Sequence, residues 1–385
     1  MAAAMNRRNW LKASSLLTGS LAFLPSTWNK LEAAPSKNYI PFISEAEFLE
    51  NAPPAIKARL SANENPFGPS AKAKEAIAGA MATSYQYAFT DARTFAGNIA
   101  KREQVEPGMV LLAPGSTSIL MATAIHFAKD GGNVITGDPS YADLPGMATR
   151  FNAKWIKVPL TADYKLDLDA MEKAIDADTK LVCICNPNNP TGTSLDAAKL
   201  RAFCERVSKK VTVFVDEAYI DYLPDVKAET MIDLVRAGNN IIVARTFSKL
   251  YGFAGLRIGY AIVPAALRGK LELYNGGNGL SSLSLAAAIA AYDDFDYLKD
   301  ALAKTMASRD YLYSVLKAEK YEYIPSSANF VMFPIKMEGR RFSEEMAKRG
   351  VGIRTWKFSG KDWCRVSIGT MEEMQAFAAA FKELS

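Results

Sequence analysis

Short apolar runs recur along the middle of the chain, and they alternate with patterns typical of helices. The runs are rich in Val, Ile and Leu, as expected of strands that are buried on both faces of a sheet. Strands are predicted near residues 110, 134, 156, 182, 213 and 242. Because strands that alternate with helices pair in parallel, we predict an α/β protein with a mostly parallel sheet. A ligand is expected at the carboxyl ends of its strands.

From residue 283 the pattern changes to longer helical stretches with a few separate strands. Helices are predicted at 283–316, with a break near 293–296, and at 341–349 and 371–384. Strands are predicted at 328–333, 351–355 and 363–368. Antiparallel strands with helices indicate a second, smaller α+β domain. We therefore predict a large ligand-binding domain at 61–275, a C-terminal small domain at 276–385, and an N-terminal segment at 35–60 that is part of the small domain.

The composition is that of a globular protein, with 49% hydrophobic and 23% charged residues in a chain of 385. The net charge of +5 is mild for this length, and no basic run is interleaved with aromatic residues, so nucleic-acid binding is not indicated. The four cysteines form no CxxC pair, and His126 is the only histidine. We therefore expect no metal site, and a single histidine excludes most Ser-His and Cys-His hydrolase schemes.

The N-terminus has the features of a targeting segment. Arg7 and Arg8 precede Trp10 and Leu11, and a moderately apolar stretch of small residues follows at 13–24. This arrangement resembles a twin-arginine export signal, and the stretch is short for a transmembrane helix. We predict an export signal at 1–34 and a periplasmic mature protein. If the segment is instead a disordered or amphipathic tail, the protein is cytoplasmic.

Lys249 follows the apolar run Ile241–Ala244 and precedes a loop rich in glycine. A lysine just beyond a buried strand is partly desolvated, which lowers its pKa and makes its amine a usable nucleophile. Thr246 and Ser248 before it, and Arg257 after it, offer donors for a phosphate. This combination suggests a Schiff base with pyridoxal phosphate (PLP). By itself, the lysine is equally consistent with an ordinary solvated loop residue.

Other polar residues follow the remaining predicted strands. The stretch Gly115–Thr117 lies between a strand and a helix, where N–H groups, hydroxyls and the helix dipole face one anion. A simple helix N-cap is the alternative for this stretch. Tyr141 also follows a strand and is suited either to stacking on a flat ring or to ordinary packing. Asn189 and Asp216 occupy two further strand ends. A single shared ligand explains these positions together.

Six motifs follow one another along the chain: Ala62–Pro66, Gly115–Thr117, Asn186–Gly192, Asp216–Tyr219, Arg245–Lys249 with Arg257, and Cys364–Thr370. In the order and spacing of these motifs, the chain from about residue 58 to its end resembles the fold-type I, class I and II PLP-dependent aminotransferases, and most closely their histidinol-phosphate aminotransferase subgroup. The resemblance implies a PLP-dependent transferase fold of the aspartate aminotransferase type. Its large α/β domain at 61–275 is then the PLP-binding domain.

The resemblance assigns roles around the cofactor. It implies that Lys249 is the Schiff-base lysine and proton shuttle, and that Asp216 keeps the pyridine nitrogen protonated. It implies that Tyr219 and Asn189 bind the phenolic oxygen of the ring, and that Tyr141 stacks on the ring. Contacts with the phosphate are implied for Gly115, Ser116, Thr117, Thr246, Ser248 and Arg257.

The resemblance also assigns the substrate side. Arg365 is implied as the clamp for the substrate α-carboxylate, because a planar two-pronged donor fits that group best. Arg354 is implied to meet the distal group of the substrate, and Asn63 is assigned to the same side. Tyr87 resembles the tyrosine that a neighbouring subunit lends to the phosphate. This implies a homodimer with shared active sites.

The implied reaction is a ping-pong transfer of an amino group between an L-amino acid and a 2-oxo acid, through an internal aldimine on Lys249. The chain departs from the subgroup in two places: only Tyr87 remains of a usual Arg-Tyr-Pro-Asp stretch, and 275–284 is rich in Gly and Ser. These departures argue against histidinol phosphate as the natural substrate, and we predict an aromatic or acidic amino acid instead. The alternatives are a PLP-dependent decarboxylase, racemase or lyase, or a non-catalytic exported binding protein.

Overall fold

The computed structural model describes residues 55–275 and 279–385. The described residues all belong to one compact unit, Pro54–Ser385. The predicted export signal and most of the predicted N-terminal segment therefore lie outside the described residues. Within the described part, no helix is both long enough and apolar enough to cross a membrane.

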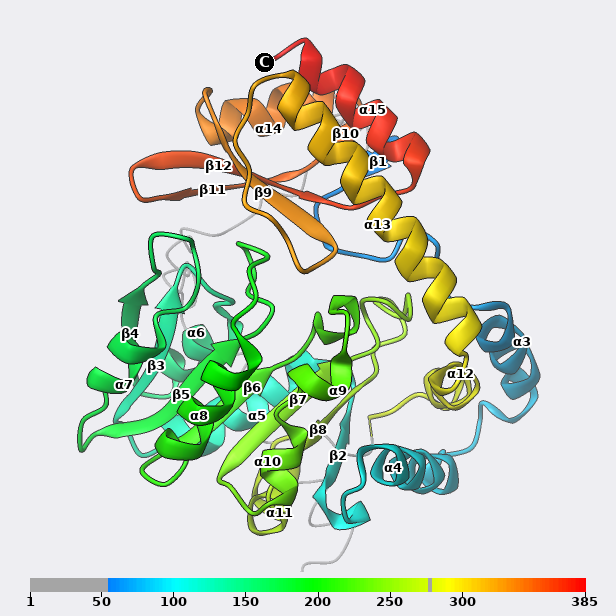
Figure 1. Cartoon of the computed structure of the whole chain (residues 1–385). Helices are drawn as coiled ribbons and strands as arrows, with labels where there is room; N and C mark the ends of the chain where they lie inside the picture. Colours follow the sequence, from blue (N-terminus) through cyan, green and yellow to red (C-terminus); the bar gives the residue numbers. More distant parts are fainter. Residues whose placement is uncertain (1–54, 276–278) are drawn as a thin grey trace, which may run out of the picture. The chain divides into compact units, whose positions relative to one another are not determined.

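A seven-stranded sheet forms the centre of the large domain (Figure 1). Its strands, in spatial order, are β2 (Val110–Ala113), β8 (Gly259–Ile262), β7 (Ile241–Thr246), β6 (Thr212–Asp216), β5 (Thr179–Cys185), β3 (Asn133–Asp138) and β4 (Lys154–Pro159). Only β8 runs antiparallel to its neighbours in this sheet. The predicted mostly parallel sheet and all six predicted strands of this region are confirmed. The sequence pattern did not reveal β8.

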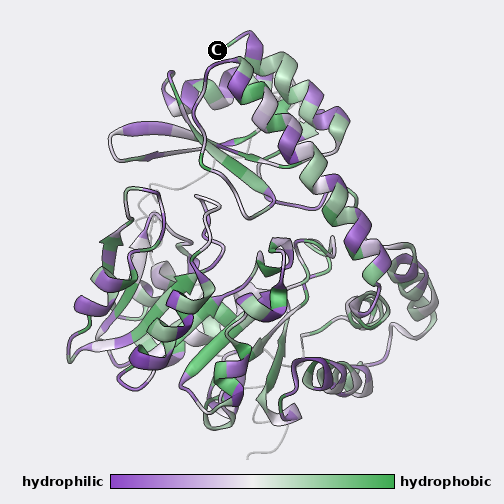
Figure 2. Ribbon diagram, in the orientation of Figure 1, coloured by the Kyte–Doolittle hydropathy of each residue, from purple (hydrophilic) through white to green (hydrophobic). Residues whose placement is uncertain are grey.

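Helices cover both faces of this sheet, and Figure 2 shows apolar residues along the central strands. Successive side chains of a strand point to opposite faces. Accordingly, Ile241 and Val243 join one apolar core, and Ile242 and Ala244 join another. The helices are α3 (Ala71–Ala80), α4 (Phe89–Glu103), α5 (Ser116–Ala128), α6 (Asp143–Arg150), α7 (Leu168–Lys173), α8 (Ala197–Val207), α9 (Val226–Glu229), α10 (Ile232–Arg236), α11 (Ala265–Glu272) and α12 (Ser282–Tyr292), with 3-10 turns η2 (Met81–Thr83), η3 (Pro107–Met109) and η4 (Ile220–Tyr222).

The smaller α+β domain is also present. Its three-stranded antiparallel sheet has the order β11 (Arg354–Phe358), β12 (Lys361–Ser367), β9 (Phe330–Ile335), and its helices are α13 (Phe295–Ala318), α14 (Gly339–Lys348) and α15 (Met371–Lys382). The single strand predicted at 351–355 is wrong. It is two strands, because Ile353 packs into the apolar core while its neighbours pair with different partners. The first of the two, β10 (Val351–Gly352), pairs in parallel with β1 (Ala58–Arg59).

The limits of the large domain at residues 61 and 275 remain a prediction. Ala58 and Leu60 pack with Phe333 in the apolar core of the smaller domain. Leu285 and Tyr292 of α12 instead pack in a core of the large sheet. The chain therefore passes between the two cores near β1 and again along α13, whose Leu298 packs against the core of the large sheet and whose Leu312 lies in the core of the smaller domain.

Candidate active site

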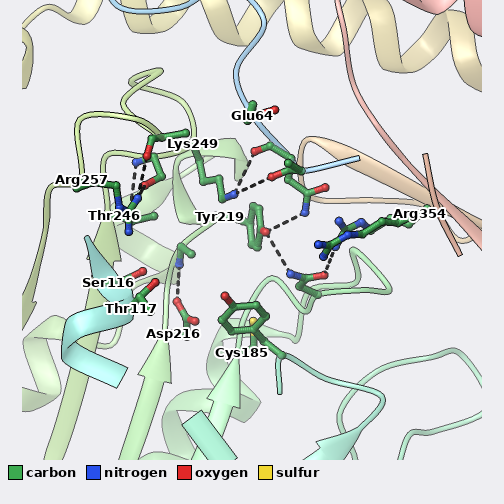
Figure 3. Close-up of a pocket in the computed structure, with 18 residues that line it drawn as sticks. Glu64, Ser116, Thr117, Cys185, Asp216, Tyr219, Thr246, Lys249, Arg257 and Arg354 are labelled. Carbon is green, nitrogen blue, oxygen red and sulfur yellow. Dashed lines mark hydrogen bonds between the residues drawn. The ribbon is translucent and has the colours of Figure 1, made fainter. Parts of the chain in front are cut away.

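A pocket of about 290 Å³ lies at the carboxyl ends of the central strands (Figure 3). Cys185, Asp216 and Thr246, the last residues of β5, β6 and β7, line it from the large domain. All of the predicted site residues except Gly115 and Tyr87 line this pocket: Asn63, Ser116, Thr117, Tyr141, Asn189, Asp216, Tyr219, Thr246, Ser248, Lys249, Arg257, Arg354 and Arg365. The strand order of the sheet thus brings together residues that are far apart in the sequence.

Lys249 lies three residues beyond the end of β7 and points into the pocket (Figure 3). Its Nζ donates a hydrogen bond to the backbone carbonyl of Asn63 at 3.1 Å. Burial lowers the pKa of the Lys249 amine to about 8, and the charge of Arg365 acts in the same direction. An amine with this pKa is partly unprotonated near neutral pH, so it is available as a nucleophile and as a base.

Asp216, the last residue of β6, is 6% exposed. The backbone N–H of Ala218 donates to its Oδ1 at 3.1 Å. Among the described residues, no side chain donates a hydrogen bond to its carboxylate or forms an ion pair with it. Burial raises the pKa of Asp216 to about 6. A buried carboxylate with so few donors is a site for a cationic or protonated group of a ligand.

A hydrogen-bond network connects Tyr219 to Arg365. The hydroxyl of Tyr219 accepts from Nδ2 of Asn63 at 2.9 Å and from Nδ2 of Asn189 at 3.3 Å. The Oδ1 of Asn189 accepts in turn from Nη1 of Arg365 at 2.6 Å. Ser367 donates to Oδ1 of Asn63 at 2.9 Å. These contacts connect the Tyr219 hydroxyl to one N–H group of Arg365 through the side chain of Asn189.

An anion cradle lies on the other side of Lys249. Its members are Gly115, Ser116, Thr117, Thr246, Ser248 and Arg257. Ser116 begins α5, so the N-terminal N–H groups of that helix face the cradle. Arg257 donates to the hydroxyl of Ser248 at 3.3 Å, and Thr246 donates to the same hydroxyl at 3.0 Å. A side chain at Gly115, where φ is +76°, would be strained and would overlap the Arg257 guanidinium unless that group moved.

Arg365 on β12 and Arg354 on β11 lie directly opposite each other in the antiparallel pair. Arg365 is 3% exposed; its Nη2 donates to the carbonyl of Ser61 at 2.9 Å, and its Nε is buried without a partner among the described residues. Burial lowers the pKa of Arg365 to about 10, and Arg354 contributes in the same direction. Arg354 is exposed at the pocket wall. Two guanidinium groups on one wall favour an anionic ligand.

Two predicted residues do not line the pocket. Gly115 lies behind it, against Arg257. Tyr87 is 81% exposed and stacks on Phe89 with ring centroids 5.4 Å apart, outside the pocket of its own chain. Tyr85 and Met81 are exposed beside it in the sequence.

Glu64 also lines the pocket, although no role was predicted for it from the sequence. Its carboxylate accepts two hydrogen bonds from Arg59, each 2.9 Å long, and its charge opposes the lowering of the Lys249 pKa. Its position within the Ala62–Pro66 motif was the available signal. Across residues 55–275 and 279–385, no group of three His, Cys, Asp or Glu side chains is placed to hold a metal ion.

A buried arginine, Arg245, forms ion pairs with two glutamates next to the residues that line the pocket. The Nε of Arg245 donates to Glu217 at 2.9 Å, and its Nη1 donates to Glu103 at 2.9 Å. Glu217 directly follows Asp216, and Arg245 directly precedes Thr246. The pair therefore holds the ends of β6 and β7 together, next to the residues that face the pocket. The sequence alone did not identify this partnership.

Comparison with known proteins identifies the protein family that the chain matches. Residues 55–381 match the sequence profile of the family described as aminotransferase class I and II. The chain is 34% identical over 329 residues to a histidinol-phosphate aminotransferase of Moorella thermoacetica, covering 85% of each chain. It is 36% identical over 327 residues to an aromatic amino acid aminotransferase of Rhodococcus opacus, covering 85% of this chain and 89% of that one. The crystal structure of the Sinorhizobium meliloti histidinol-phosphate aminotransferase in complex with pyridoxal-5'-phosphate has a TM-score of 0.80 at 25% identity, covering 91% of this chain and 98% of that chain.

The chain belongs to the class I and II aminotransferase family. Its fold is that of the aspartate aminotransferase-like PLP enzymes, as predicted. The protein is a PLP-dependent aminotransferase that acts on amino acid and 2-oxo acid substrates, and PLP is its cofactor. The predictions of the enzyme class and of the cofactor are therefore confirmed.

Proposed function

We propose that this pocket transfers an amino group between an L-amino acid and a 2-oxo acid in a ping-pong cycle, with Lys249 as the residue that carries the cofactor. One observation carries this proposal. An amine with a pKa of about 8 and a buried carboxylate that lacks a side-chain donor line the same pocket, next to an anion cradle (Figure 3). A pocket for a neutral or purely anionic ligand has no need of such a carboxylate.

The residues present fit PLP. Asp216 would accept a hydrogen bond from a protonated pyridine nitrogen, and the cradle around Arg257 would hold the phosphate. Tyr141 lines the pocket and would stack on the ring, while Tyr219 and Asn189 would bind its phenolic oxygen. When bound, the cofactor supplies an electron sink that stabilises negative charge at the substrate α-carbon.

The protein's own residues then orient the substrate and move its protons. Arg365 binds the α-carboxylate through the guanidinium N–H groups that Asn189 and Ser61 leave free. The unprotonated Nζ of Lys249 accepts the proton of the α-carbon and later donates it, as general base and then general acid. Asp216 remains ionised beside the positive charge that it stabilises.

We infer that the substrate is an aromatic or an acidic amino acid. Arg354 supports an acidic side chain, because it offers a second guanidinium on the wall that holds Arg365. The Rhodococcus opacus relative supports an aromatic side chain. Histidinol phosphate is the competing substrate, since other relatives carry that name. A panel of amino donors with 2-oxoglutarate, histidinol phosphate included, decides among the three.

We also propose a homodimer in which Tyr87 of one subunit reaches the anion cradle of the other. The support is the exposure of Tyr87 outside its own pocket, together with exposed Met81, Tyr85 and Phe89 nearby in the sequence. Exposed apolar side chains that gather in one segment are typical of contact surfaces.

A periplasmic location is proposed from Arg7 and Arg8 and the apolar stretch that follows them. Replacing both arginines by lysine should leave the protein in the cytoplasm. Unchanged export of this variant would contradict the proposal.

The core of the proposed function is tested on the purified protein. Borohydride reduction of the PLP-loaded protein should attach the cofactor covalently to the peptide that contains Lys249, and Lys249→Ala should abolish both this label and turnover. Conversion of an L-amino acid to its 2-oxo acid should form pyridoxamine phosphate. Release of carbon dioxide, or racemisation without pyridoxamine phosphate, would favour the decarboxylase or racemase alternative. Uptake of PLP without any turnover would favour a binding protein.

A further inference from the structure

The Arg365 guanidinium lies against two aromatic rings. Its Cζ is 4.6 Å from the ring centroid of Trp356 and 5.2 Å from that of Phe330. Trp356 does not line the pocket, whereas Arg365 does. The indole therefore contacts the guanidinium without itself lining the space where a substrate binds.

The polar contacts of Arg365 leave its orientation incompletely fixed. Asn189 and the carbonyl of Ser61 each take one N–H group, and Nε has no partner within the described part of the chain. Arg354, directly opposite on β11, carries the same charge and repels it. No carboxylate in the described residues pairs with Arg365, so its remaining stabilisation comes from the ring faces, whose negative potential attracts a cation.

Trp356 is partly buried and packs against an apolar cluster that contains Trp363. It lies opposite Trp363 in the β11–β12 pair, and Trp363 stacks on Phe358 with centroids 4.6 Å apart. Tyr164, from the loop between β4 and α7, packs edge-on against Trp363 at 5.2 Å. The backbone carbonyl of Tyr164 accepts a hydrogen bond from Thr193 at 2.8 Å. We call Tyr164, Trp356, Phe358 and Trp363 the aromatic cluster; it anchors the hairpin to the large domain.

We propose that Trp356 is a positioning residue that orients Arg365 for the substrate carboxylate. This inference rests on the proposed function, because it assumes that Arg365 binds that carboxylate. Loss of the indole weakens the binding of every carboxylate substrate and leaves the proton transfers at Lys249 unchanged, since Trp356 touches neither the cofactor side nor the lysine.

The first test compares Trp356→Leu, Trp356→Phe and the control Phe358→Leu as PLP-loaded enzymes. Phe358 is the matched control, because it belongs to the same strand, face and cluster but makes no cation–π contact with Arg365 in the described structure. In single-turnover experiments, Trp356→Leu should raise the half-saturating amino acid concentration about tenfold, with the rate at saturation within about twofold. Trp356→Phe should restore most of the affinity, and Phe358→Leu should match the parent enzyme.

The second test is a double-mutant cycle with Arg365→Lys, which removes the flat guanidinium that the indole contacts. The effect of Trp356→Leu on half-saturation should largely vanish in that background. It should also be absent for a primary amine that lacks a carboxylate. An equal effect in both backgrounds, or an equal effect on the amine, would mean that Trp356 acts only through general stability, and the inference would be overturned.

A binding measurement separates this inference from the proposed function. Succinate, a simple dicarboxylate, can be titrated into the PLP-loaded protein by calorimetry without any turnover. Trp356→Leu should weaken succinate binding about tenfold, and Phe358→Leu should not. If the parent protein binds succinate but transfers no amino group, the proposed function fails while the role of Trp356 is still measured. Equal succinate affinity in all variants would refute the positioning role.

Discussion

Burial acts on Lys249 and Asp216 in the same pocket and favours the uncharged form of each. It lowers the pKa of the amine to about 8 and raises that of the carboxyl to about 6. Both values lie close to neutral pH, where small changes of environment switch the charge. The charged residues of the pocket are therefore complementary to a ligand that carries a cationic group, which Asp216 would bind, and an anionic group, which the cradle around Arg257 would bind.

The Lys249 pKa predicts how the cofactor-free protein captures PLP. Only the unprotonated amine attacks the aldehyde, so the capture rate should rise with pH to a plateau with a midpoint near 8, well below the ordinary lysine value of 10.5. Stopped-flow absorbance between pH 6 and 10 measures this profile. Arg365→Met removes a charge that lowers this pKa and should move the midpoint upward. A midpoint near 10 in the parent protein would contradict the prediction.

From the raised pKa of Asp216 we predict that its carboxylate lowers the free energy of unfolding of the cofactor-free protein in a pH-dependent way. Folded cofactor-free protein keeps the proton of Asp216 up to about pH 6, while the unfolded chain releases it near 3.8. Between these values the folded state binds more protons, so its stability falls as pH rises. Asp216→Asn should therefore stabilise the cofactor-free protein by about 1–3 kcal/mol at pH 7 and by little below pH 4.

Urea unfolding at several pH values measures this difference. Asp216→Asn should at the same time abolish amino transfer, because an amide does not keep the pyridine nitrogen protonated. A variant that is less stable than the parent at pH 7 would show that the carboxylate is satisfied by the protein itself.

At the scale of elements, Gly115 in the β2–α5 turn and Gly131 after α5 should differ in their effect on PLP binding when each is replaced by alanine. Both Gly115 and Gly131 have positive φ, +76° and +80°, but a side chain at Gly115 would overlap Arg257, whereas nothing lies within 4 Å of one at Gly131. Each alanine variant should lose about 1 kcal/mol of stability from backbone strain. Only Gly115→Ala should also weaken PLP binding, by about tenfold or more, because it displaces the guanidinium from the cradle.

Equilibrium titration of cofactor-free protein with PLP measures this, with unfolding as the check on stability. Equal PLP affinity in the two variants would show that the close approach of Gly115 to Arg257 has no part in cofactor binding.

The elements that the sequence predicted are those whose pattern is local. The parallel strands of the large sheet are apolar runs that end at polar residues. Because Asp216 and Lys249 lie at or just beyond the ends of two such runs, both were predicted as site residues from the sequence. The strand β8 was missed because Gly259–Ile262 is short and is defined by pairing with β2 and β7, far away in the sequence. Contacts such as Arg245 with Glu217, or Trp356 with Arg365, depend on strand order and register. No local pattern contains that information.

At the scale of the whole molecule, the proposed dimer predicts complementation between two defective subunits. Lys249 and Asp216 line the same pocket of one chain, whereas exposed Tyr87 is proposed to serve the pocket of its partner. A dimer of one Lys249→Ala subunit and one Tyr87→Ala subunit then contains one complete site. With random pairing, co-expressed subunits should recover about a quarter of the parent activity at limiting PLP.

The matched control pairs Lys249→Ala with Asp216→Asn. Both changes affect residues of the same pocket in one chain, so every site of the mixed dimer carries a defect and no activity should return. Each homodimer should be inactive or should bind PLP weakly, and size-exclusion chromatography should show that all variants remain dimers. Recovery in the first mixture but not in the second can arise only if Tyr87 acts across the subunit interface. Equal recovered activity in the two mixtures would show that Tyr87 does not act at the site of the partner subunit. It would also remove the main support for a homodimer with shared active sites.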